Sequence, residues 1–258
     1  MKIGILGVGN MGKAIIEGLK NVYDAKDIYA MNPVNPKVAA FQSKIGFNLY
    51  SQYVDLEKNH LDVLIVTTPA PITVQILSHF TDLSSDTIII SAAAGVKIVS
   101  LKQALPNNPI AEIIPNIPVT VNRGTIGATL SDLTEKQQEV TVKLLSSLGD
   151  VIPVHEYQLP IIGTLSGCGP AFVDVFMDAM GDAAVENGLN RHIAHKVIAS
   201  MVAGSGSMLY QSNHGPAYLK DLVTSPGGST IKGVNMLERC NFRRAVIDAV
   251  NKANDYNR

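Results

Sequence analysis

Short apolar runs recur along the first part of the chain at the spacing expected of strands. Seven of them predict strands, at Ile3–Leu6, Ile28–Met31, Val63–Thr67, Thr87–Ser91, Ile110–Ile114, Ile126–Leu130 and Val151–Val154. The early runs are almost continuously apolar, which is typical of strands that are covered on both faces of a sheet.

Between several of these runs, the apolar residues return every three or four positions, which predicts amphipathic helices. One such helix holds Met11, Ala14, Ile15, Gly18 and Leu19. A later one, with Asp132 as its expected cap and Gly149 as its expected end, holds Val140, Leu144, Leu145 and Leu148. Strands that alternate with helices predict a parallel, doubly wound sheet.

After about residue 155 the pattern changes, and no further strand is predicted. The segment Ala171–Glu186 is apolar on nearly every side, so we expect a mostly buried helix that ends at Asn187-Gly188. Its one charged stripe repeats at steps of four and consists of Asp174, Asp178, Asp182 and Glu186.

Three more helices complete the second half. One has an apolar face from Ala194 to Leu209, Pro216 opens a short one, and the last is expected over about Ile231–Asn254. We therefore expect two domains, residues 1–154 and residues 155–258. About 100 residues with so much apolar helix are not expected to remain monomeric.

The first half also contains a motif for binding a phosphate group. Gly7-Val8-Gly9-Asn10-Met11-Gly12 follows an apolar strand and opens an amphipathic helix, which is where a G-x-G-x-x-G motif binds a dinucleotide. The first glycine permits the turn, the second lets the pyrophosphate approach the backbone, and the third lets helix and strand pack closely. The alternative is a chance cluster of glycines in a turn.

The residue at the end of the second predicted strand bears on which dinucleotide is bound. An NAD-specific site would have Asp or Glu there, and this chain has Asn32, with Lys37 as a nearby cation. Because an asparagine does not repel a 2′-phosphate, we expect NADPH as the cofactor, with NADH as the alternative. Asn32 could also simply cap a turn before Pro33.

The second half contains two breaks rich in small residues. Leu222–Ile231 leads into the last helix, with Ser229 or Thr230 as the expected N-cap, and its hydroxyl and N–H groups could bind a small carboxylate. An ordinary capping loop is the alternative. Ser166–Pro170 is interpreted as a turn, and Cys168 as an inert small residue rather than a nucleophile.

The composition of the chain excludes several classes of binding partner. The 258 residues have a formal net charge of −1, which favours neither nucleic acid nor an anionic membrane. No apolar run reaches the roughly 20 residues of a membrane helix, so we expect no membrane partner. Two cysteines indicate a reducing compartment, and the N-terminus is interpreted as a strand, so we expect a cytoplasmic protein. The histidines have no metal-ligand spacing, and no metal is expected.

The order of the motifs resembles the pyrroline-5-carboxylate reductase family over nearly the whole chain. Besides Gly7–Gly12, the resemblance rests on Ser91–Gly95, Pro115–Pro118, Gly124-Thr125, Leu165–Phe172, Leu219–Ile231 and Leu237-Glu238. The block Leu219–Ile231 is the most specific. The resemblance implies an α/β protein with a Rossmann-type, doubly wound, mainly parallel sheet followed by an all-α dimerisation domain.

The resemblance further implies NAD(P)H-dependent reduction of a small imino acid, 1-pyrroline-5-carboxylate, to L-proline. It implies a homodimer through the helical domain, and in many members a decamer of five dimers. Ser225, Gly228, Ser229 and Thr230 would bind the substrate, with Thr230 as the catalytic hydroxyl near the ring nitrogen. The residues implied to contact the cofactor are Gly7, Gly9, Asn10, Met11, Gly12, Asn32, Thr68, Pro69, Ala93, Ala94 and Asn116.

The chain departs from the family pattern at several cations. Thr68 stands where the family usually has Lys, Glu112 where it has Arg, and Pro33 where many members have Arg. Ser200-Met201 stands where members of the family commonly have Gln-Thr. Two alternatives follow: a divergent member that binds nucleotide in a regulatory role, or an enzyme that reduces another small cyclic imino acid.

Overall fold

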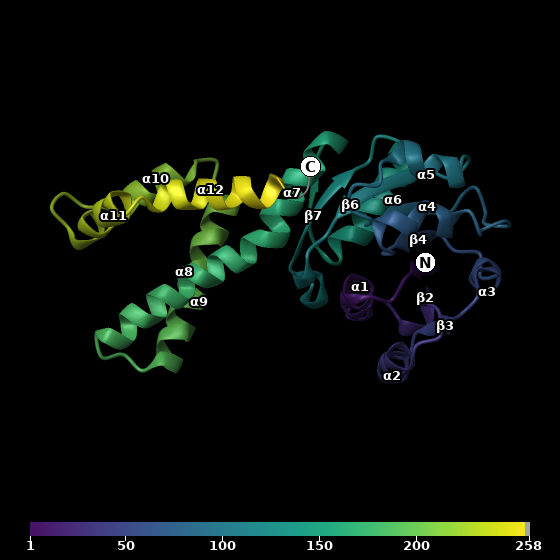
Figure 1. Ribbon diagram of the computed structural model, residues 1–258, viewed down its shortest axis with the longest axis horizontal. Coiled ribbons are helices and arrows are strands. Elements are labelled where there is room, and N and C mark those ends of the chain that lie inside the picture. The colour runs from purple at the N-terminus through teal and green to yellow at the C-terminus, as the bar shows by residue number, and fades with distance from the viewer. Residues whose placement is uncertain (256–258) are drawn as a thin grey trace. The chain divides into compact units, whose positions relative to one another are not determined.

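The computed structural model describes residues 1–255 and divides the chain into two compact units (Figure 1). The first unit contains Met1–Gly167, and the second begins at Cys168. This division lies further along the chain than the predicted domain boundary after residue 154. The reason is that α7 (Leu159–Gly163) packs against strands of the first unit, next to the short helix η3 (Glu156–Gln158).

The first unit is built on one sheet of eight strands in the order β3-β2-β1-β4-β5-β6-β7-β8. All neighbouring strands are parallel except β6 and β7. The strands are β1 (Ile3–Leu6), β2 (Ile28–Met31), β3 (Asn48–Tyr50), β4 (Val63–Val66), β5 (Ile88–Ser91), β6 (Ile110–Ile114), β7 (Gly124–Thr129) and β8 (Gly149–Pro153). The prediction of a doubly wound, mainly parallel sheet is confirmed.

Every predicted strand is confirmed, but the apolar pattern does not predict β3. It is a strand of three half-buried residues that pairs with β2 alone, at the edge of the sheet. Such a short segment has no apolar run by which a buried strand is recognised.

Helices cover both faces of the sheet, and alternate strand residues point to each face. One core contains Ile3 and Ile5 of β1 together with residues of α1 (Asn10–Lys20), α2 (Pro36–Ile45) and α6 (Glu135–Ser146). The other contains Leu6 with residues of α3 (Tyr53–Glu57), α4 (Ala70–Leu77) and α5 (Ile98–Ala104). Two buried faces explain why the strands are continuously apolar. The 3₁₀ helices η1 (Ala25–Asp27) and η2 (Ile117–Val121) lie in connections.

The caps of α6 differ from the prediction. Thr134, not Asp132, is the N-cap, and it forms a capping box with Gln137. The carboxylate of Asp132 instead accepts a hydrogen bond from the Ile110 N–H at 2.9 Å. The helix ends at Ser146, and Gly149 is the first residue of β8. A Cβ at Gly149 would lie 2.0 Å from the Gly124 carbonyl oxygen, so the close approach of β7 and β8 requires glycine at this position.

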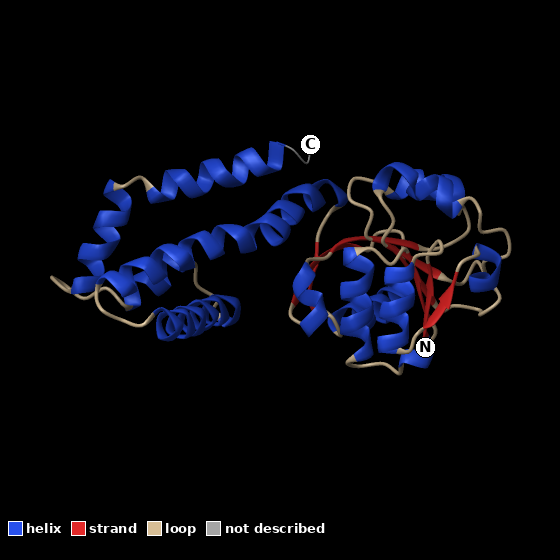
Figure 2. Cartoon of the chain, turned by 60° about the horizontal axis from the view of Figure 1, so that its bottom comes forward, coloured by secondary structure: helices blue, strands red, loops and turns tan. Residues whose placement is uncertain are grey.

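The described part of the second unit consists of helices joined by loops and contains no strand (Figure 2). It contains α8 (Gly169–Glu186), α9 (Arg191–Gln211), α10 (Pro216–Leu222), α11 (Ser229–Arg239) and α12 (Phe242–Asp255). The predicted last helix is thus two helices, broken where Asn241 adopts a φ of 57°. Ser166–Pro170 is not a turn, because a π-helical stretch, Thr164–Cys168, leads directly into α8.

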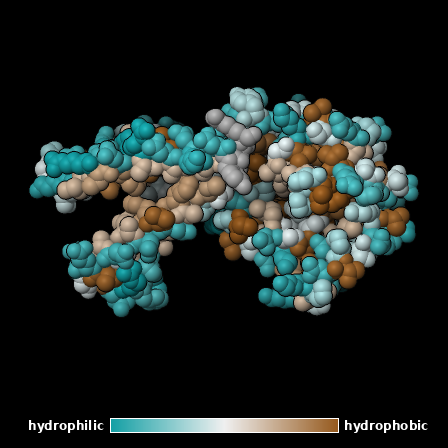
Figure 3. Space-filling model, viewed as in Figure 1, coloured by the Kyte–Doolittle hydropathy of each residue, from teal (hydrophilic) through white to brown (hydrophobic). Residues whose placement is uncertain are grey.

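The expectation that α8 is mostly buried is wrong for the single chain. Gly181 is its one buried residue, and Val173, Val175, Met180 and Val185 are exposed. Apolar side chains of α9, including Val197, Met201 and Met208, are exposed as well. Figure 3 shows the resulting apolar surface on helices of the second unit. The apolar pattern of α8 and α9 therefore predicts that their faces are covered, but it does not predict which surface covers them.

One helical segment, Glu156–Glu186, is long and apolar enough by length and composition alone to cross a membrane. A helix that packs in a protein interface can meet the same two criteria, and the acidic stripe of α8 lies on this segment. The absence of a membrane partner stays a prediction.

Candidate functional site

The three glycines of the loop after β1 have three different environments. Gly7 adopts a φ of 95° and packs against the Thr67 backbone. A Cβ at Gly12 would lie 2.2 Å from the Gly7 carbonyl oxygen, so any side chain there would displace the turn. A Cβ at Gly9 would meet no protein atom within 4 Å. The fold thus requires glycine at positions 7 and 12, whereas Gly9 leaves the backbone open to a ligand.

The N-terminus of α1 completes this phosphate loop. Gly9 is the N-cap, and no side chain accepts a hydrogen bond from the first N–H groups of the helix, which begins at Asn10 and Met11. Free N–H groups and the helix dipole favour an anion at this position. The residues present therefore fit a pyrophosphate.

Asn32, at the end of β2, lies directly beside the phosphate loop. Its Oδ1 accepts a hydrogen bond from the Val8 N–H at 3.0 Å, and its Nδ2 donates to the Pro33 carbonyl oxygen at 2.7 Å. Both ends of the side-chain amide are therefore bonded within the protein. Asn32 holds the loop in place and also makes the turn contact with Pro33.

Thr67, directly after β4, holds the same loop, a role that its sequence context does not predict. Its hydroxyl donates to the Gly7 carbonyl oxygen at 2.6 Å. Because β4 pairs with β1, the residues after it, Thr68 and Pro69, lie at the same edge of the sheet as the loop. The Thr68 and Thr73 hydroxyls share a hydrogen bond of 2.9 Å, which ties Thr68 to α4. The one signal in the sequence was the hydroxyl at the end of a predicted strand.

The two alanines after β5 differ in exposure. Ala93 is buried in the core, and its N–H donates to the Ser91 hydroxyl at 3.3 Å. Ala94 is exposed, and Gly95 follows it with a φ of 79°. Of the two side chains predicted to lie along the cofactor, only that of Ala94 is accessible.

Asn116, after β6, has a buried side chain that is also bonded at both ends. Its Oδ1 accepts from the Thr125 N–H at 2.8 Å, and its Nδ2 donates to the Ser166 carbonyl oxygen at 3.0 Å. The side chain therefore joins the start of β7 to the π-helical stretch. Its contribution to a nicotinamide pocket would be to position the backbone around it.

Glu112, within β6, lies beside a second acidic residue, Glu156 of η3. Glu112 is 3% exposed, and burial, followed by the charge and hydrogen bond of Glu156, raises its pKa to about 7, while Lys97 opposes the shift. One Glu156 oxygen accepts from the Ile98 N–H at 3.0 Å. Burial beside a second carboxyl group therefore favours the protonated form of Glu112.

The remaining predicted residues belong to the second unit. Gly228, not Ser229 or Thr230, is the N-cap of α11, because its backbone is still extended where the helix begins. Its N–H donates to the Ser225 carbonyl oxygen at 3.0 Å, which closes the preceding turn. No side chain caps this helix. Ser229 and Thr230 are exposed, and their hydroxyls have no hydrogen-bond partner among the described residues. Hydroxyl and N–H donors are thus both available to a carboxylate.

Two family models match this chain. Residues 156–258 match the model for pyrroline-5-carboxylate reductase dimerisation, and residues 2–95 match that for coenzyme F420-dependent NADP oxidoreductase. The pyrroline-5-carboxylate reductase of Escherichia coli is 36% identical over 97% of this chain and 95% of the relative. That of Methanosarcina acetivorans is 30% identical over 98% and 96%.

Solved structures of similar proteins agree with this grouping. The Coxiella burnetii pyrroline-5-carboxylate reductase superposes with a TM-score of 0.86 at 28% identity, covering 99% of this chain and 97% of that one. The Plasmodium falciparum pyrroline carboxylate reductase, solved with NADP bound, has a TM-score of 0.83 at 26% identity, covering 100% and 97%.

Proposed function

The chain belongs to the pyrroline-5-carboxylate reductase family, and we propose that it reduces 1-pyrroline-5-carboxylate to L-proline with NADPH, with NADH as the alternative cofactor. The observation that carries this proposal is the phosphate loop, in which Gly9 is open to a ligand while Gly7 and Gly12 are required by the backbone. The relative with NADP bound supports the choice of cofactor.

The first unit would hold the cofactor. The N–H groups at Gly9, Asn10, Met11 and Gly12 would bind its pyrophosphate. Thr68, Pro69 and Ala94 lie at the carboxyl ends of β4 and β5, where ligands bind in doubly wound sheets. Ala93 and Asn116 would act by positioning the backbone, since their side chains are buried or bonded. When bound, the nicotinamide supplies a hydride.

The loop before α11 would hold the substrate. Ser225, Gly228, Ser229 and Thr230 offer hydroxyl and N–H donors to its carboxylate. In the reaction the imine carbon gains a hydride and the ring nitrogen holds a proton. The Thr230 hydroxyl would donate or relay that proton. The protein otherwise has to orient the ring and exclude water.

The second unit would mediate assembly. Its match to a dimerisation family supports homo-oligomerisation, and its exposed apolar residues on α8 and α9 need a covering surface. We propose a homodimer through the helical unit, with a decamer of five dimers as the larger assembly. We also propose a cytoplasmic location, which the presence of only two cysteines supports.

One observation favours a second candidate. Thr68 and Glu112 replace a Lys and an Arg of the usual family pattern, and Glu112 lies in an acidic pair instead of an ion pair. This would fit a member that binds nucleotide in a regulatory role, or one that reduces another cyclic imino acid.

A reductase assay separates these candidates. Purified protein is expected to oxidise NADPH or NADH only when 1-pyrroline-5-carboxylate is added. A folded protein that binds cofactor in calorimetry without turnover would contradict the enzymatic proposal. Turnover only with another cyclic imino acid from a substrate panel would support the last candidate.

A further inference from the structure

We propose that Glu112 and Glu156 form a proton-dependent contact that positions the loop after β5 for the cofactor, so that the protein takes up a proton when it binds NADPH. The inference rests on the cofactor site proposed above, which includes Ala93 and Ala94 of this loop. Glu112 and Glu156 are positioning residues, because they act through the backbone of the loop and not on the cofactor itself.

The loop after β5, residues 92–97, is fixed by a hydrogen bond at each end. At its start, the Ala92 N–H donates to the β4 backbone at 2.8 Å. At its end, the Ile98 N–H donates to Glu156 Oε1 at 3.0 Å, although these two residues are 58 positions apart. Lys97, the N-cap residue of α5, makes no side-chain capping bond, so the cap of this helix is supplied by Glu156.

The accessible part of the loop lies close to the Glu156 contact. Ala94 and Gly95 are exposed, and a Cβ at Gly95 would meet no protein atom within 4 Å. Only Val96 and Lys97 separate these two residues from Ile98. Loss of the bond to Glu156 would therefore shift the segment that faces the cofactor.

Glu112 is the group that controls Glu156. Its neighbours in register on β5 and β7 are Ser91 and Thr129, and its Oε2 is buried with no hydrogen-bond partner among the described residues. An ionised Glu112 would thus place a charged oxygen in a buried site without a donor. A hydrogen bond between two carboxyl groups needs a proton on one of them. The neutral form of Glu112 therefore donates to Glu156, and the ionised form repels it.

Few other charges surround Glu112. Burial and Glu156 raise the pKa of Glu112 to about 7, and Lys97 opposes the shift. Lys102 of α5 is paired with Asp132 instead, at 2.8 Å. The residues of β5, β7 and α7, which also pack against β6, are all uncharged. Glu156 and Lys97 are consequently the two charges that set the titration of Glu112 among the described residues.

Cofactor binding and protonation of Glu112 favour each other. Below about pH 7, neutral Glu112 donates to Glu156, which stays bonded to Ile98. As the pH rises through about 7, Glu112 ionises, and repulsion between the two carboxylates releases Ile98. Because the cofactor binds to the held loop, it raises the pKa of Glu112 further, and a proton is taken up from solution. The affinity for NADPH is therefore highest below pH 7 and falls as the pH rises.

Calorimetry on the full chain tests this coupling without turnover. Titration of NADPH in two buffers of different ionisation enthalpy reports the protons taken up, and titration between about pH 6.5 and pH 8.5 reports the change in Kd. We expect uptake of up to about one proton and a rise in Kd of about fivefold over this range. Glu112→Gln does not ionise at this site and still donates through its amide, so it should keep the low Kd.

The comparison with Glu112→Gln also removes a contribution of the cofactor. The 2′-phosphate of NADPH titrates in both proteins, so the difference between them reports on Glu112 alone. Equal proton uptake and equal pH profiles in the parent protein and Glu112→Gln would overturn the proposal.

Two variants of Glu156 have opposite expected effects. Glu156→Gln keeps an acceptor for Ile98 and gains a donor for ionised Glu112, so its Kd should stay low throughout. Glu156→Ala loses the bond to Ile98, so its Kd should be raised severalfold at every pH. Hydrogen exchange of the Ile98 N–H at about pH 8 should be faster in the parent protein than in Glu112→Gln. Equal exchange, or a low Kd in Glu156→Ala, would contradict the role of Glu156.

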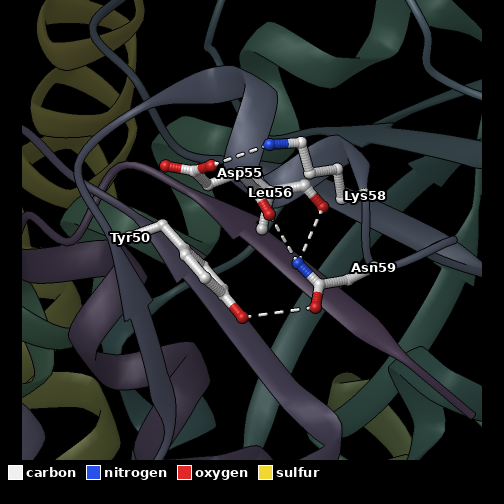
Figure 4. Close-up of polar contacts among 5 residues, drawn as sticks. All are labelled: Tyr50, Asp55, Leu56, Lys58 and Asn59. Atoms are coloured by element: carbon white, nitrogen blue, oxygen red, sulfur yellow. Dashed lines mark hydrogen bonds and ion pairs between the residues drawn. The ribbon is translucent and has the colours of Figure 1, made fainter.

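Asp55 of α3 offers a matched control, because it is a carboxylate of the same unit with a cation as its partner. It pairs with Lys58 at 3.3 Å, and its carbonyl oxygen accepts a hydrogen bond from the Asn59 amide (Figure 4). Asp55→Asn removes one negative charge, as Glu112→Gln does, and should leave the pH dependence of Kd unchanged. A flattened profile in Asp55→Asn would show that net charge sets the affinity, against the proposal.

The outcomes also separate this proposal from the proposed activity. A protein that takes up a proton through Glu112 on binding NADPH but does not reduce 1-pyrroline-5-carboxylate would support the contact and contradict the enzyme. A protein that reduces the substrate and binds NADPH with the same pH profile in Glu112→Gln would do the reverse. A folded protein that binds neither NADPH nor NADH would contradict both.

Discussion

The Thr67 hydroxyl, at the end of β4, donates a hydrogen bond of 2.6 Å to the Gly7 carbonyl oxygen in the loop after β1. The two residues are 60 positions apart. The bond fixes the first glycine of the phosphate loop from the neighbouring strand, so the shape of the loop depends on the sheet as well as on its own sequence.

Thr67→Val tests this bond while nearly preserving side-chain volume. The loss of one hydrogen bond is expected to reduce the free energy of unfolding by about 1 kcal/mol and to weaken cofactor binding severalfold, because the loop loses a fixed point. Urea unfolding and titration with NADPH would measure the two effects. Thr67→Ser keeps the hydroxyl and should retain affinity; equal loss in both variants would contradict a role for the bond.

Two glycines of the loop predict different effects on stability and the same direction of effect on cofactor affinity. Gly9→Ala should leave stability nearly unchanged, because its Cβ would meet no protein atom, yet weaken the binding of NADPH and NADH. Gly12→Ala should lower both stability, by more than about 1 kcal/mol, and affinity, because its Cβ would overlap the Gly7 carbonyl oxygen. Thermal unfolding with and without cofactor would show both. Unchanged affinity in Gly9→Ala would place the phosphate elsewhere.

The acidic pair makes stability depend on pH. Since folding raises the pKa of Glu112 from 4.5 to about 7, its stabilising contribution is complete below about pH 4.5 and is lost as pH rises through about 7. The expected slope is at most about 1.4 kcal/mol per pH unit. Glu112→Gln removes this slope and should be more stable than the parent protein at pH 8. Urea unfolding between pH 5 and pH 8, at constant protein concentration, measures the difference.

Glu156 and Lys97 both act on the carboxyl group of Glu112, so variants of these two residues serve as controls for the dependence of stability on pH. Glu156→Gln should lower the pKa of Glu112 and move the loss of stability to lower pH. Lys97→Gln removes an opposing charge and should move it to higher pH. Identical profiles for all variants would show that the slope arises elsewhere.

Thr230 is the residue on which the proposed chemistry depends most. Thr230→Ala is expected to reduce kcat with 1-pyrroline-5-carboxylate on the order of 100-fold, as loss of a proton donor would, while the Kd for NADPH stays the same. Thr230→Ser should restore much of the activity. An alanine variant within twofold of the parent enzyme would exclude the hydroxyl from the reaction.

Much of the first unit follows from the sequence because its signals are local. Continuous apolar runs identify the buried strands, and three glycines after the first run identify the phosphate loop, because both signals lie in adjacent residues. The sequence does not predict the edge strand Asn48–Tyr50, because a strand of three half-buried residues has no periodic apolar pattern. It does not predict the Thr134 cap either, because capping depends on which side-chain oxygen reaches the free N–H groups of the helix.

The tertiary structure decided how the polar side chains of the site are used. Asn32 and Asn116 both matched family motifs, but only the fold shows that Asn32 bonds to Val8 and that Asn116 bonds to Thr125 and Ser166. Hydrogen bonds between residues distant in sequence leave no local pattern, because they depend on which strand ends and loops the folded sheet brings together. The apolar faces of α8 and α9 follow the same logic: periodicity determines that a face is apolar, whereas only the folded and assembled chain determines what covers it.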